Sequence, residues 1–306
     1  MKYLIPALLL CGAFNYSCQK DGPEKDNSRL ALFKKATQFN SNISETSFEF
    51  QYDTQGRLTK VNDQVYYYGQ NGKVDYSRIE ARNQNNGIIR EKIIRLSYHW
   101  DQQNRLKNII MDSLYHKSYS VSENILYEES LAKDVLLSSY FYTPGASAPT
   151  KIVYRKLDGS NGKIGLEEEA MYTLEADNIT KSKRYEYLMT PLPSLLGDYK
   201  FGLTLFSFFQ YSNTINPLYP IYKQMGFNPV DINQVISKNL ENAFFSTSVQ
   251  GKTDQEMQPD WAKKTAVKIT LDASGKSTAM NYVVKADFGD AKDVILSEVL
   301  LNYVYE

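Results

Sequence analysis

Short stretches in which hydrophobic and polar residues alternate recur along most of the chain, separated by turn residues. The clearest is Phe48 to Val61, which has aromatic residues at every second position, then Asp53-Thr54-Gln55-Gly56, then a second alternating run. A period of two is typical of a strand with one buried face. This stretch therefore predicts two antiparallel strands joined by a tight turn.

The residues in these turns follow from backbone geometry. An Asp side chain accepts hydrogen bonds from backbone N–H groups two residues further on, and Gly or Asn tolerates the positive φ that closes a tight turn. Five residues are therefore assigned to turn structure and not to chemistry: Asp53, Gly56, Gly72, Asn104 and Gly275.

Degenerate copies of this unit follow it along the chain. Val65 to Val74 has Asn-Gly in its turn, the dipeptide most typical of a hairpin, and Ile94 to Leu106 and Val267 to Lys276 repeat the plan. The spacing between copies is irregular, which argues against a uniform solenoid. The sequence predicts a mainly β fold, an antiparallel meander of hairpins that forms an open curved sheet or a partial barrel.

Residues 189–245 interrupt the alternation. Five prolines fall within this segment, and prolines this dense exclude central strands. Pro217 to Gly226 and Val230 to Ser237 each predict a short helix. The segment is expected to be a partly helical cover over one face of the sheet, because a bare apolar face would aggregate.

The N-terminus has the plan of a secretory signal over residues 1–17. A positive start is followed by an apolar run, Tyr3 to Phe14, which is too short to span a bilayer. Ser17 before Cys18 resembles the lipobox of bacterial lipoproteins, which implies cleavage before Cys18 and lipid attachment to it. Cys11 is the weaker candidate, because the residue before it is the bulky Leu10.

The rest of the chain divides into a tether and one domain. Residues 18–44 are polar with mixed charges and are expected to be a tether, in which Leu30 to Ala36 forms a helical turn or an edge strand. Residues 45–306 are predicted to be a single β-meander domain.

The amino-acid composition limits the kinds of partner that the chain is expected to bind. Lys plus Arg and Asp plus Glu each number 35, so no net field draws the chain to nucleic acid. The 24 Tyr and 14 Phe suit a pleated sheet with one wet face. Most rings are expected in the core, and a ring on the wet face could stack on a sugar or pack against a protein. The candidate ligand-contact aromatics are Tyr67, Trp100 and Trp261.

The sequence contains no catalytic, metal-binding or cofactor-binding motif. The two histidines, His99 and His116, have no cysteine partners for a zinc site if Cys18 is lipidated. Gly275-Lys276-Ser277 lacks the earlier glycine of a phosphate-binding loop, and there is no Gly-x-Ser-x-Gly elbow. No catalytic residue, metal or cofactor is predicted. A polysaccharide hydrolase remains an alternative, because paired carboxylates meet only in the fold.

The segment Tyr52-Asp53-Thr54-Gln55-Gly56-Arg57-Leu58 resembles the YD repeat of the rearrangement-hotspot and teneurin proteins. Together with the leader and the Pro-rich segment, the layout resembles small YD-repeat lipoproteins of Bacteroidota. Gln19-Lys20-Asp21 after the cysteine resembles the signal that sends such lipoproteins to the outer face of the outer membrane. The resemblance implies an antiparallel β architecture and an outer-membrane lipoprotein, exposed on the cell surface or, alternatively, facing the periplasm. The predicted function is a non-enzymatic, membrane-anchored module that binds a glycan or a protein.

Overall fold

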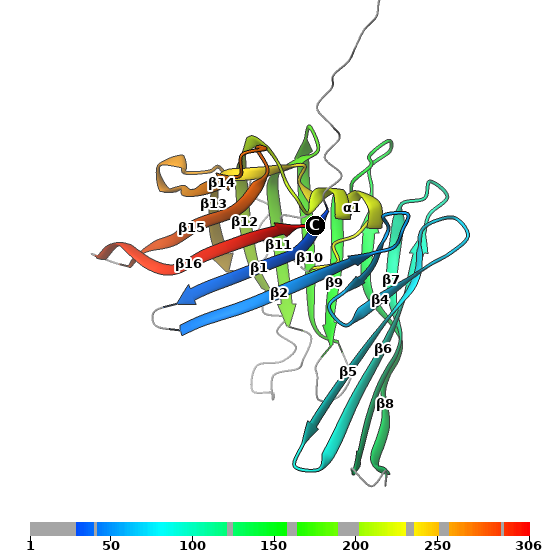
Figure 1. The fold of residues 1–306 in the computed structure, drawn as a ribbon. Coiled ribbons are helices and arrows are strands. Elements are labelled where there is room, and N and C mark those ends of the chain that lie inside the picture. The colour runs from blue at the N-terminus through cyan, green and yellow to red at the C-terminus, as the bar shows by residue number, and fades with distance from the viewer. Residues whose placement is uncertain are drawn as a thin grey trace, which may run out of the picture.

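The computed structural model describes residues 29–39, 42–120, 125–157, 164–188, 202–230, 236–250, 257–288 and 291–306. The predicted signal peptide and Cys18 lie outside these residues. Figure 1 shows that strands dominate the described part and that one short α-helix, α1, lies near one end of them.

The strands are long and follow one another with short connections. Their bounds are β1 (Leu30–Phe39), β2 (Asn42–Tyr52), β3 (Leu58–Val61), β4 (Gln64–Tyr68), β5 (Val74–Asn85), β6 (Ile88–Trp100), β7 (Leu106–Ser120), β8 (Ile125–Phe141), β9 (Lys151–Leu157), β10 (Ile164–Glu175), β11 (Asn178–Leu188), β12 (Gly202–Ile215), β13 (Asn239–Gln250), β14 (Thr265–Leu271), β15 (Ser277–Phe288) and β16 (Ala291–Tyr305). The helices are α1 (Tyr219–Met225) and the 3-10 helix η2 (Trp261–Lys263).

These strands form a closed barrel. Each pairs antiparallel with its neighbours in sequence, and β1 pairs with both β2 and β16, so the first strand meets the last. The predicted antiparallel meander is confirmed. The expected open sheet or partial barrel is corrected to a closed one, and closure removes the two free edges that an open sheet would expose.

Closure depends on a strand that the sequence pattern assigns to the tether. Residues 30–39 and 42–44 are not a tether but form β1 and the start of β2, and β1 has neighbours on both sides, so it is no edge strand. Phe33 is fully buried, with its ring 5.3 Å from that of Tyr303 and 6.0 Å from that of Phe48. The sequence pattern indicates a polar segment because two lysines follow Phe33, but the inward-facing side chains of β1 belong to the core.

The Pro-rich segment also differs from the prediction. Its apolar patch is part of β12, a full wall strand, and its end belongs to β13. The predicted helix at Pro217 to Gly226 is present as α1, which stops where Gly226 adopts a φ of 75°. The second predicted helix, Val230 to Ser237, falls largely outside the described residues.

α1 packs into one end of the barrel instead of covering an outer face. Its buried residues Ile221, Tyr222 and Met225 join one core cluster with side chains from strands all around the wall. The ring of Phe227, just after the helix, stacks on that of Tyr98 at 4.6 Å. In the described part of the chain, no helix has the length and hydropathy to cross a membrane.

Candidate functional site

The barrel wall has a weak seam where β13 meets β14. Two residue pairs join these strands, Ala243 with Ala266 and Phe244 with Thr265. These pairs involve the first two residues of β14, which has 7 residues, while β13 and β15 have 12 each. On the β14 side, no described strand pairs with the second half of β13, Phe245 to Gln250, or of β15, Val283 to Phe288.

The barrel interior reaches solvent at this seam. Ser246 and Ser248 lie on the inward side of β13, because Ser246 is in register with Ser207 and Ser182 of the cavity described below. Both Ser246 and Ser248 are nevertheless exposed. A complete wall would bury side chains at these positions, so the missing half of β14 opens the interior.

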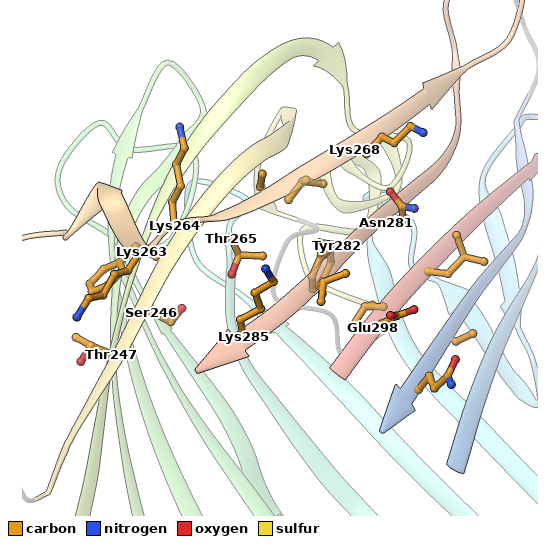
Figure 2. Close-up of a pocket in the computed structure, with 18 of the residues that line it drawn as sticks. Ser246, Thr247, Lys263, Lys264, Thr265, Lys268, Asn281, Tyr282, Lys285 and Glu298 are labelled. Atoms are coloured by element: carbon orange, nitrogen blue, oxygen red, sulfur yellow. The ribbon is translucent and has the colours of Figure 1, made fainter. Parts of the chain in front are cut away.

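A groove of about 1360 Å³, here called the seam groove, runs along this opening. Figure 2 shows side chains of β13 on one side of it and those of β15 and β16 on the other: Ser246 and Thr247, then Asn281, Tyr282, Lys285 and Glu298. Its volume exceeds the roughly 300–1,000 Å³ of typical small-molecule pockets. The seam groove therefore fits part of a larger ligand.

The seam groove combines apolar and cationic side chains. Exposed apolar side chains come from β2 and β16, with Ile43 64% and Leu300 42% exposed. Lys264 and Lys268 are exposed beside the groove, and Lys263 contacts Asp260 at 3.9 Å. The rim formed by η2 and β14 is thus cationic, although the chain as a whole has no net charge.

A second cavity, of about 200 Å³, lies inside the barrel and is here called the inner cavity. Ser182, Ser207 and Ser246 lie side by side on β11, β12 and β13, and the hydroxyl oxygens of Ser207 and Ser246 are 2.9 Å apart. Three small side chains at one level leave unfilled the space that large core residues would take. The volume equals that of about seven water molecules at roughly 30 Å³ each.

The inner cavity is lined by buried polar groups as well as aromatic rings. Glu241 is 2% exposed, and the guanidinium of Arg184 lies 3.6 Å from the carboxylate of Glu168. Burial raises the pKa of the Tyr172 and Tyr211 phenols, so both stay neutral at ordinary pH. The phenol of Tyr211 donates to the carbonyl of Ile179 at 2.6 Å.

The seam groove and the inner cavity share two lining residues. Ser246 and Tyr282 line both of them.

A pair of carboxylates also faces the barrel interior. Glu168 and Glu186 are directly opposite each other on β10 and β11, on the same side as Arg184. Directly paired side chains have Cβ atoms about 4.5–5.5 Å apart. This is the kind of carboxylate pair that the hydrolase alternative requires, with Arg184 offsetting the charge of Glu168.

The three candidate ligand-contact aromatics lie in different parts of the structure. Tyr67 is 40% exposed on β4, where its ring stacks on Tyr76 at 4.4 Å and Arg95 lies over the other ring at 4.5 Å. This exposed ladder is a cross-strand arrangement that stabilises a sheet, and it lies on a part of the wall other than the seam.

Trp100 and Trp261 have different surroundings. Trp100 is partly buried, its Nε1 donates to the carbonyl of Val74 at 2.8 Å, and its ring packs against Gly226. Trp100 therefore fastens α1 to the wall. Trp261 begins η2, between the groove residues Asp260 and Ala262, and is the one of the three aromatics that lies beside the seam groove in sequence.

The residues assigned to turns lie in turns. The carboxylate of Asp53 accepts hydrogen bonds from the backbone N–H groups of Gln55 and Arg57, and the bond from Arg57 is the main cause that lowers its pKa. Four residues adopt a positive φ, namely Gly56 at 80°, Gly72 at 71°, Asn104 at 58° and Gly275 at 85°.

The described residues were also compared with the requirements of a metal site, which needs several His, Cys, Asp or Glu side chains close together. There, no three His, Cys, Asp or Glu side chains come together in a way that could hold a metal ion. Neither the seam groove nor the inner cavity was anticipated from the sequence, because both depend on which strands lie side by side in the closed barrel. Uncharged small residues on the inward side of β11, β12 and β13 are the one local signal of the inner cavity.

Comparison with known proteins gave several similar solved structures, three of which are described below. No family model matches the chain, and no curated protein matches it. A porin-like protein from Bacteroides vulgatus is 9% identical with a TM-score of 0.39, over 92% of this chain and 99% of that one. A porin-like protein from Bacteroides uniformis is 11% identical with a TM-score of 0.40, over 90% and 98%. The Tc holotoxin pore of Photorhabdus luminescens is 10% identical with a TM-score of 0.17, over 85% of this chain and 15% of that one. TM-scores this low support no argument about function.

Proposed function

We propose that this protein is a lipid-anchored binding module of the bacterial outer membrane. Cys18 carries the lipid, and the seam groove holds part of a glycan or protein partner. The observation that carries the proposal is the opening in the wall beside β14, along which a groove of about 1360 Å³ runs. A barrel built only for stability would extend β14 to the length of its neighbours and bury this surface.

The anchor is tested by changing the cysteine. Cys18→Ala is expected to release the protein from the membrane fraction, because one lipid attachment site is lost. Cell fractionation followed by detection of the protein measures this release. Cys11→Ala is the matched control and is expected to leave the protein in the membrane fraction. Membrane association of Cys18→Ala equal to that of the unchanged protein would refute the anchor.

The groove is tested by photo-crosslinking in living cells. A photoreactive amino acid at Thr247 or Val283, both of which line the seam groove, is expected to give covalent adducts with the partner. The same amino acid at the exposed Lys107 on β7 is the control and is expected to give none. Protease treatment of the adducts then separates a protein partner from a glycan. Absence of adducts at both groove positions, or equal yields at position 107, would contradict the proposal.

A second candidate function, hydrolysis of polysaccharide, is favoured by the opposed Glu168 and Glu186. It requires one carboxyl to donate a proton while the other acts as nucleophile or base. Release of reducing sugar from envelope and plant polysaccharides measures it. On this alternative the unchanged protein releases sugar, and both Glu168→Gln and Glu186→Gln abolish the release. No release by the unchanged protein would exclude the tested polysaccharides as substrates.

A further inference from the structure

We infer that the occupant of the seam groove is an extended acidic segment of a partner protein, which adds as a strand to the open edge of β13. The inference rests on the proposed function and specifies the partner of the same groove. It follows from three features of the seam: an unpaired strand edge, the sequence of that edge, and the charge beside it.

The edge has the geometry of an acceptor for a strand. Phe245 to Gln250 pair with β12 on one side, and on the other side no described strand continues beyond the contact of Phe244 with Thr265. Six residues of strand span about 20 Å at roughly 3.4 Å per residue. An added strand running antiparallel to β13 would continue the line of β14 along this length.

The sequence of this edge leaves it open to pairing. Natural sheets block exposed edges with charged side chains, prolines or bulges. Phe245-Ser246-Thr247-Ser248-Val249-Gln250 contains no charge and no proline, and its register with β12 is regular from Phe245 to Gln250. The facing half of β15 carries the exposed Lys285, so β13 is the better acceptor.

The charge beside the edge selects the partner. Lys264 and Lys268 are exposed on the rim of the groove, one before β14 and one within it. The acidic side chains of the groove are placed differently: Asp260 contacts Lys263, and Glu45 and Glu298 lie on β2 and β16, across the groove from β13. An acidic segment gains from these charges, whereas a basic one is repelled. Backbone hydrogen bonds supply the affinity in such strand additions, and alternate side chains supply the selectivity.

The test uses a defined probe, a fluorescent ten-residue peptide that alternates Glu and Val, with the full mature chain carrying Cys18→Ala. Fluorescence anisotropy measures binding at low salt, and hydrogen exchange measures protection of the amides. Binding is expected, with slower exchange at Phe245 to Gln250. A peptide methylated on alternate backbone nitrogens should bind at least about tenfold more weakly, because it cannot form the strand ladder.

Charge variants sharpen the same test. A peptide that alternates Lys and Val should bind several-fold more weakly than the Glu–Val peptide, and the difference should shrink as salt is added. Lys264→Glu combined with Lys268→Glu should reverse this preference. Lys107→Glu, on a different part of the wall, is the matched control and should leave it unchanged.

Each contrary outcome has a distinct meaning. Equal binding of the methylated peptide, no binding of the Glu–Val peptide, or unchanged exchange at Phe245 to Gln250 would overturn strand addition. A protease-resistant adduct in the crosslinking experiment would identify a glycan partner, which overturns this inference and leaves the proposed function standing. An adduct of twice the mass of the protein would identify a second copy of the chain and would also overturn it. Absence of any adduct at the groove positions would overturn both.

Discussion

The α1 end of the barrel and the seam are built from the same kind of strand, but the barrel interior is filled by side chains at the α1 end and is open at the seam. At the α1 end the phenol of Tyr68 donates to the carbonyl of Leu58 at 2.7 Å, and the amide of Gln224 donates to the carbonyl of Gly56 at 3.0 Å. Large rings fill the remaining space. At the seam, serines occupy inward-facing positions, two strands separate after two residue pairs, and a groove remains.

The comparison of the two regions shows where aromatic side chains contribute to packing. At the α1 end, rings such as Trp100 and Tyr98 pack on the segment around α1 and fasten it in place. At the seam, β13 and β14 pair over two residues, and serines take the place of large rings. The opening that results is the surface proposed to bind a partner. Binding is therefore expected at the irregular part of the barrel, and stability is expected to come from the regular part.

The largest effect should come from matched leucine truncations in the two regions. Leu106 is fully buried at the α1 end, while Leu300 in the seam groove is 42% exposed. Leu106→Ala should lower the free energy of unfolding by about 2–5 kcal/mol, because it leaves a cavity. Leu300→Ala should cost less than about 1 kcal/mol. Urea denaturation measures both, and equal losses would break the distinction between the regions.

The second effect concerns the fastening of α1. A Cβ at Gly226, where φ is 75°, would lie 2.8 Å from the ring of Trp100, whereas a Cβ at Gly72, with φ of 71°, would meet nothing within 4 Å. Gly72→Ala should cost about 1–2 kcal/mol from backbone strain alone. Gly226→Ala should cost about 1–3 kcal/mol more, because Trp100 must move. Thermal or urea unfolding compares them, and equal costs would show that Trp100 does not hold α1.

A smaller effect is the alkaline response of the packed tyrosines. Burial raises the pKa of Tyr68 and Tyr142 to about 12, above the value of about 10 in the unfolded chain. Their contribution to stability is therefore complete below about pH 10 and is lost as pH rises towards 12. Unfolding free energies measured across this range should fall, and less steeply in Tyr68→Phe with Tyr142→Phe. Stability that stays constant up to pH 12 would contradict this account.

The smallest effect is expected at the exposed ladder on the outside of the wall, where Tyr67 stacks on Tyr76. Tyr67→Ser removes a ring that stacks on Tyr76 at 4.4 Å on the outside of the wall, and it should cost less than about 1 kcal/mol. Crosslinking at Thr247 should be unchanged, because Tyr67 does not line the seam groove. Loss of the adduct in Tyr67→Ser would shift the binding site towards this ladder.

The elements of the fold were largely predictable from sequence, while the candidate site was not. The hairpin at Asp53 and the end of α1 at Gly226 depend on residues a few positions apart, and the sequence pattern located both. β1 was predicted as a helical turn or an edge strand of the tether, because two lysines follow Phe33. Its place inside the wall comes from pairing with β16, where Tyr303 packs on Phe33 from the other end of the chain. Trp100 was predicted as a ligand contact, but it packs against Gly226, a residue over a hundred positions away.

The sequence by itself determined the turns, the alternation of the strands and the position of α1, because backbone φ and side-chain period are set by neighbouring residues. Only the tertiary structure decided that the meander closes and that its wall opens beside β14. Closure requires Leu30 to pair with Tyr305, and the seam arises because β14 begins only at Thr265, which is level with Phe244 of β13. Both depend on the register between strands, which is fixed by packing across the whole barrel.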